Sequence, residues 1–225
     1  MKLAVFVEGL TELEFVQALI KSICGQRGIT FEIREQYKGS LILVRVDVAP
    51  GATTYVMITN CRSDEQVKTR LRDAYPSLVT AGYTHIIGLK DVYPFSSADI
   101  PKIQAKLSVG MPIGPIPAEM HLAILEVESW FLDEITHFER IDPTLTNAAI
   151  ASAGFDVVNT MGADWTHPAQ TLDDIYRLSG KRYRKKTNHI RRTVNALSPE
   201  ELYLSVRERS PSFHGFLTGL EAALF

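Results

Sequence analysis

Short apolar segments separated by turn residues characterise the first 135 positions of the chain. Each segment is rich in β-branched and aromatic residues, which is typical of strands covered on both faces of a sheet. Helical periodicity follows most of them, and strands that alternate with helices indicate a parallel sheet with right-handed connections. The expected strands are 3–7, 41–48, 54–59, 84–89 and 121–125. The expected helices are 12–24, with Thr11 as its N-cap, 63–74, 99–107 and 127–134.

The pattern changes near residue 138, where the strand signal ends. Ser198 before Pro199 is a typical helix start, and Ser212 is expected to cap the last helix. We therefore predict the α/β fold class, with a mainly parallel sheet flanked by helices over residues 1–135 and a helical region over 136–225 packed on it. The expected helices of that region are 147–153, 170–178, 187–196, 199–208 and 212–224.

The composition narrows the class of protein. At 225 residues and 45% hydrophobic content, the chain is long enough to bury a large core. Its net charge of -2 excludes general affinity for nucleic acid, so such a partner must bind a local basic patch. Cys24 and Cys61 are too few for a disulfide framework or a zinc site, and we expect both to be buried. No segment approaches the roughly 20 apolar residues of a membrane span, which predicts a cytoplasmic protein without a membrane partner.

Acidic residues follow three of the expected strands. Glu8 and Asp91 end the first and fourth strands, and Glu126 and Glu128 come after the fifth. Ligands of open α/β sheets bind beyond the carboxyl ends of the strands, so we expect these side chains to converge. Converging carboxylates repel one another unless a cation neutralises them, and oxygen ligands select Mg²⁺ or Mn²⁺ over zinc.

Each acid also has a structural explanation when it is considered alone. Glu8 could cap a helix, and Glu12 could oppose a helix dipole in its first turn. Asp91 could form a turn before Pro94, and Glu128 could be a solvated helix residue. The joint pattern of acids after separate strands favours a metal site over these separate explanations.

A basic segment begins at residue 181 and places an aromatic residue, Tyr183, among cations. Such a segment is suited to a phosphate backbone and predicts a nucleic-acid surface. The alternatives are a solvated helix start, or pairing of Lys181 or Arg184 with the acidic site. The expected contact residues are Lys181, Arg182, Arg184, Lys185, Lys186 and Arg191.

Four segments of the chain resemble a known group of proteins. Residues 5–12, V-F-V-E-G-L-T-E, are similar to the E-G-x-T-E opening of Toprim domains of the OLD-nuclease type, and residues 86–91, I-I-G-L-K-D, resemble the later strand that ends in a D-x-D pair. Residues 125–132, L-E-V-E-S-W-F-L, are similar to the E-x-E-x-W-x-L segment of an uncharacterised bacterial Toprim-like family, a domain of unknown function. Residues 209–220, R-S-P-S-F-H-G-F-L-T-G-L, resemble the end of that family.

The resemblance covers nearly the whole chain and implies a Toprim, Rossmann-like sheet that binds Mg²⁺ and acts on phosphodiesters. It implies that Glu8 is a ligand or a general acid/base and that Asp91 holds the metal. It further implies that Glu12 orients the ion and that Glu126 or Glu128 supplies another ligand. One departure is that the second acid of the D-x-D pair is replaced by a tyrosine at position 93, which removes one charge from the site.

The leading hypothesis is therefore a Mg²⁺-dependent nuclease or phosphodiesterase that acts on DNA or RNA, with catalysis by Glu8 and Asp91. The second is a catalytically degenerate Toprim-like binding module that partners a separate ATPase, as in related anti-phage defence systems. The third is a small-molecule phosphohydrolase. Glycine-rich phosphate motifs are absent from the sequence, and Ser210, Ser212 and His214 have no acidic third member for a catalytic triad.

Overall fold

The computed structural model describes residues 1–92 and 99–225, apart from the side chains of residues 64 and 65. Position 93, where the sequence departs from the D-x-D pattern, lies outside the described residues. The described chain forms two compact units. The first unit contains Met1–Lys90, 99–122 and Phe216–Phe225, and the second contains 91–92 and Ala123–Gly215. The division into domains at residue 135 stays a prediction.

A six-stranded sheet has the strand order β3-β2-β4-β1-β5-β6. The strand β1 pairs in parallel with β4 and β5, and β2 also pairs in parallel with β4, whereas β2 and β3 form an antiparallel pair. This arrangement confirms the α/β class with a mainly parallel sheet. The strands are β1 (Lys2–Val7), β2 (Ile29–Tyr37), β3 (Ser40–Asp47), β4 (Thr54–Asn60), β5 (His85–Asp91) and β6 (Ala118–Ala123).

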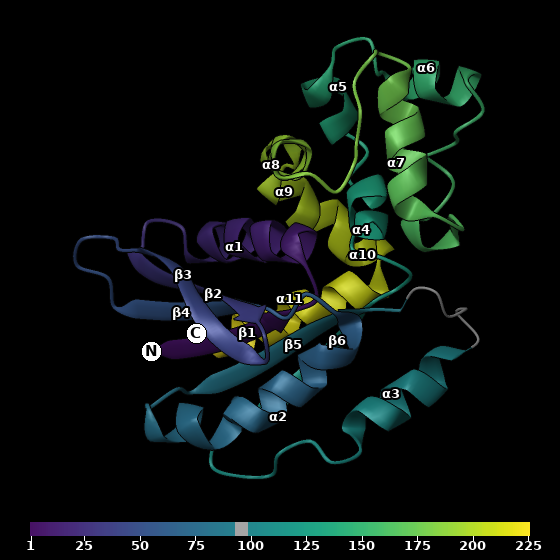
Figure 1. Cartoon of the computed structure of the whole chain (residues 1–225). Coiled ribbons are helices and arrows are strands. Elements are labelled where there is room, and N and C mark those ends of the chain that lie inside the picture. Colours follow the sequence, from purple (N-terminus) through teal and green to yellow (C-terminus); the bar gives the residue numbers. More distant parts are fainter. Residues whose placement is uncertain (93–98) are drawn as a thin grey trace. The chain divides into compact units, whose positions relative to one another are not determined.

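Helices of the first unit cover both faces of the sheet, with α1 on one face and α2 and α3 on the other (Figure 1). Leu3 to Val7 of β1 are fully buried, as expected for a central strand between two helical layers. Ala4 and Phe6 pack into the core formed with α2. The helices are α1 (Leu10–Cys24), α2 (Asp64–Thr80) and α3 (Ile100–Ser108).

Two details of the first unit differ from the prediction. The strand β2 (Ile29–Tyr37) was not expected, because charged residues interrupt its apolar positions and only alternate side chains are buried. The helix α1 begins at Leu10 with Gly9 as its N-cap residue, so Thr11 lies inside the helix and does not cap it. Both cysteines are buried, as expected.

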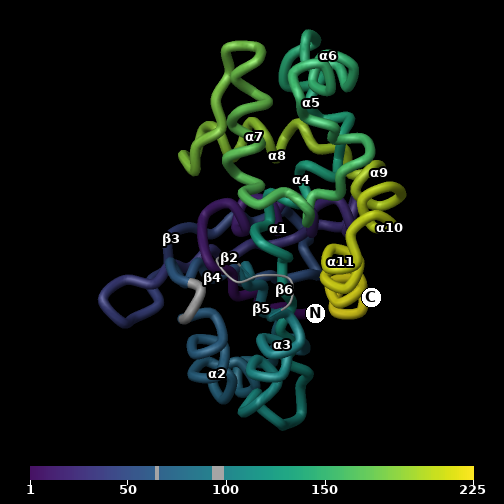
Figure 2. Tube along the Cα trace, turned by 90° about the vertical axis from the view of Figure 1, so that its right-hand side faces the viewer, coloured from purple at the N-terminus to yellow at the C-terminus, as the bar shows by residue number. Residues whose placement is uncertain are grey.

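The second unit is helical, and α4 contacts η2, α7 and η3 within it. Figure 2 shows the path of this unit through α5, α6, α7 and α8. Trp130 and Phe131 of α4 are fully buried. The elements are α4 (Glu128–Asp133), α5 (His137–Ile141), α6 (Asn147–Ser152), η2 (Gly162–Asp164), α7 (Pro168–Arg177), α8 (Thr187–Ala196), α9 (Pro199–Glu201), η3 (Leu202–Val206) and α10 (Arg207–Arg209), followed by α11 (Pro211–Leu224), which continues into the first unit.

The two predicted serine caps have different outcomes. The hydroxyl of Ser198 accepts a hydrogen bond from Glu201 N, which confirms the cap before Pro199. Ser212 instead lies inside α11, and its hydroxyl accepts a 2.9 Å hydrogen bond from Trp130 Nε1.

Within the described residues, none of the helices combines the length and apolar character that a membrane span requires.

Candidate metal centre

A sharp turn brings the candidate metal ligands of the second unit together. Asp91 is the last residue of β5, and Val92 N donates to Ala123 O at the end of β6. Leu125 then adopts φ 62°, a left-handed conformation that is unusual for a bulky residue. Such strain persists only where the surroundings hold it and is typical of functional sites. The turn leads directly into Glu126 and α4 (Glu128–Asp133).

Asp91, Glu126 and Glu128 form the candidate site, which we call the acidic cluster. One carboxylate oxygen of each residue lies within 4.8 Å of the other two. The Glu128 side chain is fully buried, and Asp91 is 4% exposed. Glu126 is partly buried and is the member that solvent reaches. The structure thus gathers three of the five carboxylates expected to bind metal, and all three belong to the second unit.

Hydrogen bonds hold the orientation of each carboxylate. Asp91 Oδ1 accepts from Val127 N at 3.2 Å, and Glu126 Oε2 accepts from Ala169 N at 3.2 Å in the first turn of α7. The hydroxyl of Tyr183 donates to Glu128 Oε1 at 2.7 Å. Glu128 Oε2 is buried and has no hydrogen-bond partner. A buried carboxylate oxygen without a partner is costly, which identifies a position that a cation would satisfy.

Lys185 supplies the counter-charge of the acidic cluster. Its Nζ lies 2.8 Å from Glu126 Oε1 and 3.6 Å from Glu128 Oε1. Burial lowers the pKa of Lys185, but attraction by Glu128, Glu126 and Asp91 outweighs it, and the net shift is upward. The amine is therefore a protonated ammonium. Pairing of Lys181 or Arg184 with the acidic site was one of the alternatives for this segment. Lys181 instead lies 4.0 Å from Asp142, and Lys185 contacts the carboxylates.

Burial dominates the electrostatics of Glu128. It raises the pKa of this carboxyl group, and repulsion by Glu126 adds to the rise, while Lys185 and the Tyr183 hydrogen bond partly oppose it. One ammonium therefore does not fully compensate the buried charge. A divalent ion would supply more charge, and a set of three carboxylates with only oxygen donors suits Mg²⁺ or Mn²⁺.

Glu8 and Glu12, the other expected ligands, belong to the first unit. Glu8 follows β1 (Lys2–Val7) and is partly buried, and its charge is one cause of the raised pKa of Cys61. Glu12 is 3% exposed in the first turn of α1. Their participation in metal binding stays a prediction.

The predicted nucleic-acid residues occupy different environments. Arg182 is engaged with Asp173, which its Nε contacts at 3.0 Å and its Nη2 at 3.0 Å. Arg184 and Lys186 are exposed, as is Arg191. Tyr183 is 2% exposed and binds Glu128, so the expectation that this aromatic side chain belongs to a nucleic-acid surface was wrong. The role of the basic residues stays a prediction.

Comparison with known families identifies the family of the chain. The family model described as Domain of unknown function (DUF4276) matches residues 7–221. The chain belongs to this family. Every residue of the acidic cluster, as well as Tyr183 and Lys185, falls inside the part that matches DUF4276.

No curated protein matches this DUF4276 chain. Among solved structures, it is similar to a protein of Lactobacillus plantarum WCFS1 described as a cell surface hydrolase, at 9% identity and a TM-score of 0.31. The similarity covers 61% of this chain and 57% of that one.

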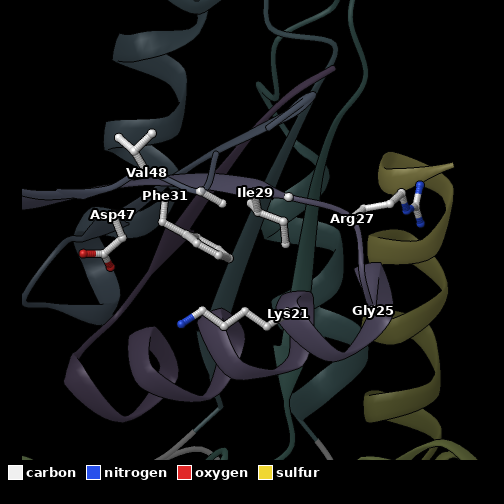
Figure 3. A pocket seen from close by; sticks show the side chains of 9 residues that line it. Lys21, Gly25, Arg27, Ile29, Phe31, Asp47 and Val48 are labelled. Atoms are coloured by element: carbon white, nitrogen blue, oxygen red, sulfur yellow. The ribbon is translucent and has the colours of Figure 1, made fainter. Parts of the chain in front are cut away.

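The first unit of the DUF4276 chain contains a separate pocket of about 360 Å³ between the end of α1 and the strands β2 and β3 (Figure 3). Lys21, Arg27, Phe31 and Asp47 line it. The Asp47 carboxylate is already bound, since Gln17 and Arg45 donate hydrogen bonds to Oδ2 at 3.1 and 3.0 Å. The pocket has a single carboxylate and therefore lacks the ligand set of a metal site.

Sequence reasoning missed two contributors to the acidic cluster. Tyr183 and Lys185 were assigned to a nucleic-acid surface, yet both side chains contact Glu128. A general signal was present, because basic side chains are expected to pair with carboxylates that converge on one site. The sequence could not identify which cation does so, because residues 181–186 contain no helix or strand that would set the direction of each side chain.

Proposed function

We propose that the acidic cluster binds Mg²⁺ or Mn²⁺ and that this DUF4276 protein is a Toprim-type phosphodiesterase acting on DNA or RNA. The observation that carries the proposal is the convergence of three carboxylates with a fully buried Glu128, whose Oε2 has no hydrogen-bond partner. The motif similarity to OLD-type Toprim domains supports it independently. A role in anti-phage defence is part of the same proposal.

The residues have distinct roles in this proposal. Asp91 and Glu128 are held by the hydrogen bonds from Val127 N and Tyr183, so they are oriented before an ion binds. Glu126 is the partly exposed ligand, on the side from which a substrate can approach. A bound divalent ion would polarise the phosphate and lower the pKa of a water molecule. Glu8, at the end of β1, would act as general acid/base, as the resemblance implies.

Metal titration by calorimetry tests the site. Glu128→Gln and Asp91→Asn should each weaken Mn²⁺ binding at least about tenfold, because each removes a ligand charge. Asp47→Asn is the matched control, since this carboxylate lies outside the acidic cluster and is paired with Arg45. Equal Mn²⁺ affinity in the wild type and Glu128→Gln would refute the metal site.

Cleavage assays test the activity separately. The wild type should cut DNA or RNA in Mg²⁺, and Glu8→Ala and Asp91→Ala should each abolish cutting while the far-ultraviolet circular dichroism spectrum is unchanged. Cutting that persists in both variants would remove the nuclease assignment. A panel of phosphate monoesters under the same conditions distinguishes a small-molecule phosphohydrolase.

A catalytically inactive binding module that partners a separate ATPase is the second candidate. The ion pairs of Lys185 favour it, because an ammonium already neutralises part of the cluster. The tyrosine in place of the second acid of D-x-D points the same way. Purified protein that cuts no nucleic acid but co-purifies with an ATPase encoded beside it would support this function over hydrolysis.

A further inference from the structure

The ammonium of Lys185 contacts the oxygens that a metal ion would need. It lies 2.8 Å from Glu126 Oε1 and 3.6 Å from Glu128 Oε1. Magnesium binds carboxylate oxygens at about 2.1 Å, so an ion held by the same two residues would approach the ammonium closely. Two cations at that separation in a poorly solvated site repel each other strongly.

Lys185 differs from the other members of the site because its charged group can move away from the carboxylates. It belongs to residues 181–186, which form neither helix nor strand, and its side chain is 47% exposed. Glu128 is in contrast fully buried in α4, where the Tyr183 hydroxyl holds it. A flexible four-carbon side chain can carry its charge from the carboxylates into solvent without rearrangement of the helix.

The acidic cluster also needs positive charge beside it whenever its carboxylates are ionised. Three carboxylates with oxygens within 4.8 Å of one another repel, and Glu128 cannot reach solvent. Removal of Lys185 without replacement would therefore leave buried negative charge uncompensated. A divalent ion that displaces Lys185 would supply the positive charge that the ionised carboxylates need.

We propose that Lys185 is a built-in counter-ion that neutralises the acidic cluster before a divalent ion binds and is displaced when that ion enters. The inference rests on the proposed metal site and adds its regulation: metal affinity is set by competition with a residue of the chain itself. Metal binding then frees the Lys185 ammonium beside the site, where it can contact a phosphate group.

Mn²⁺ titration of Lys185→Met tests the exchange. Methionine keeps most of the length of the side chain and removes its charge. Mn²⁺ should therefore bind about tenfold tighter than in the wild type, the size of a typical coupling between two sites. Lys185→Arg, which keeps a cation, should not show this gain. Lys186→Met is the matched control: it removes one charge from the neighbouring exposed position and should leave Mn²⁺ affinity unchanged.

Thermal unfolding gives a second readout that does not depend on activity. In EDTA, Lys185→Met should melt below the wild type because its carboxylates lack a counter-ion, and saturating Mn²⁺ should abolish or reverse this difference. Mn²⁺ affinity of Lys185→Met equal to or weaker than that of the wild type would overturn the exchange while leaving the metal site intact. Failure of both proteins to bind Mn²⁺ would refute the exchange and the proposed function together.

A labelling experiment on the wild type covers the case in which Lys185→Met does not fold. Reductive methylation followed by mass spectrometry reports the accessibility of each lysine amine. Addition of Mn²⁺ should accelerate labelling of Lys185, because its amine leaves the carboxylates, and should leave Lys186 unchanged as an internal standard. Labelling of Lys185 that is unchanged or slower in Mn²⁺ would overturn the exchange.

Discussion

The hydroxyl of Tyr183 donates a 2.7 Å hydrogen bond to Glu128 Oε1 across 55 residues of sequence, and both side chains are buried. This bond ties the segment before α8 to the first turn of α4, where the acidic cluster is built. It joins a neutral donor to a carboxylate, and such hydrogen bonds are among the stronger ones in proteins. Tyr183 is therefore expected to orient Glu128 and to stabilise the second unit.

Tyr183→Phe should lower the free energy of unfolding by about 2 kcal/mol, because Glu128 loses a partner that no solvent can replace. Urea denaturation followed by circular dichroism measures the change. Tyr203→Phe serves as the control at a side chain that is 47% exposed, and a change within about 0.5 kcal/mol is expected there. Equal effects of the two substitutions would contradict the role of Tyr183.

Arg209→Met should destabilise the protein by about 3–5 kcal/mol, because it leaves Asp133 buried without its cation. Arg209 Nε lies 3.0 Å from Asp133 Oδ1, and that aspartate side chain is 2% exposed. Urea denaturation provides the measurement, and Arg177→Met is the control at the exposed pair with Asp174. Combining Arg209→Met with Asp133→Asn should cost less than the sum of the two single substitutions; strict additivity would refute the coupling.

His137 should make stability fall as the solution is acidified. Burial lowers its pKa to about 4, below the ordinary 6.5. The folded state therefore binds fewer protons than the unfolded state between these values. The contribution is full above pH 6.5 and is lost as pH falls toward 4, by about 3 kcal/mol in total. The measurement is the unfolding free energy of wild type and His137→Asn at several pH values from 7.5 to 4.5.

The difference between these two proteins isolates the histidine, because carboxylates with raised pKa values, such as Asp133, contribute with the opposite sign in both. The wild-type profile should decline more steeply than that of His137→Asn. Parallel profiles would show that His137 is not buried in its neutral form.

Gly162→Ala should destabilise the second unit by about 3 kcal/mol or prevent its folding. An added Cβ would lie 1.9 Å from the backbone oxygen of Ser129, the residue after Glu128, and backbone cannot move aside cheaply. Gly215→Ala is the matched comparison, because a Cβ there meets nothing within 4 Å. It lies inside α11 and should gain about 0.5–1 kcal/mol. Thermal unfolding of both variants is the measurement; similar melting temperatures would contradict the close packing at Gly162.

If the basic segment binds nucleic acid, Arg184→Ala and Lys186→Ala should each weaken binding to single-stranded DNA at low salt. Each phosphate contact that is lost should also reduce the dependence of log K on log salt by about 0.7. Fluorescence anisotropy at several salt concentrations is the measurement. Arg182→Ala is expected to act mainly on stability, because its guanidinium is bound to Asp173. An unchanged salt slope in both exposed variants would exclude this surface.

The sequence by itself determined the class of the fold and the positions of most strands. Continuous apolar runs such as 3–7 are typical of strands that are buried on both faces of a sheet. The loss of the strand signal after residue 138 predicted the helical second part. The sequence also showed that acids follow several strands. Because the carboxyl ends of parallel strands lie at one edge of a sheet, these acids were expected to converge. The strand β2 (Ile29–Tyr37) was missed because partial burial allows charged residues at alternate positions.

Only the tertiary structure decided how the acidic charges are compensated. Which cation reaches a carboxylate depends on the path of the segment 181–186, and that path is set by contacts with distant residues such as the one between Tyr183 and Glu128. The burial of Glu128 is likewise a property of packing, because no local pattern distinguishes it from a solvated helix residue. The charges of the acidic residues and their spacing can be read from the sequence. Their desolvation and their pairing with cations depend on how the folded chain packs.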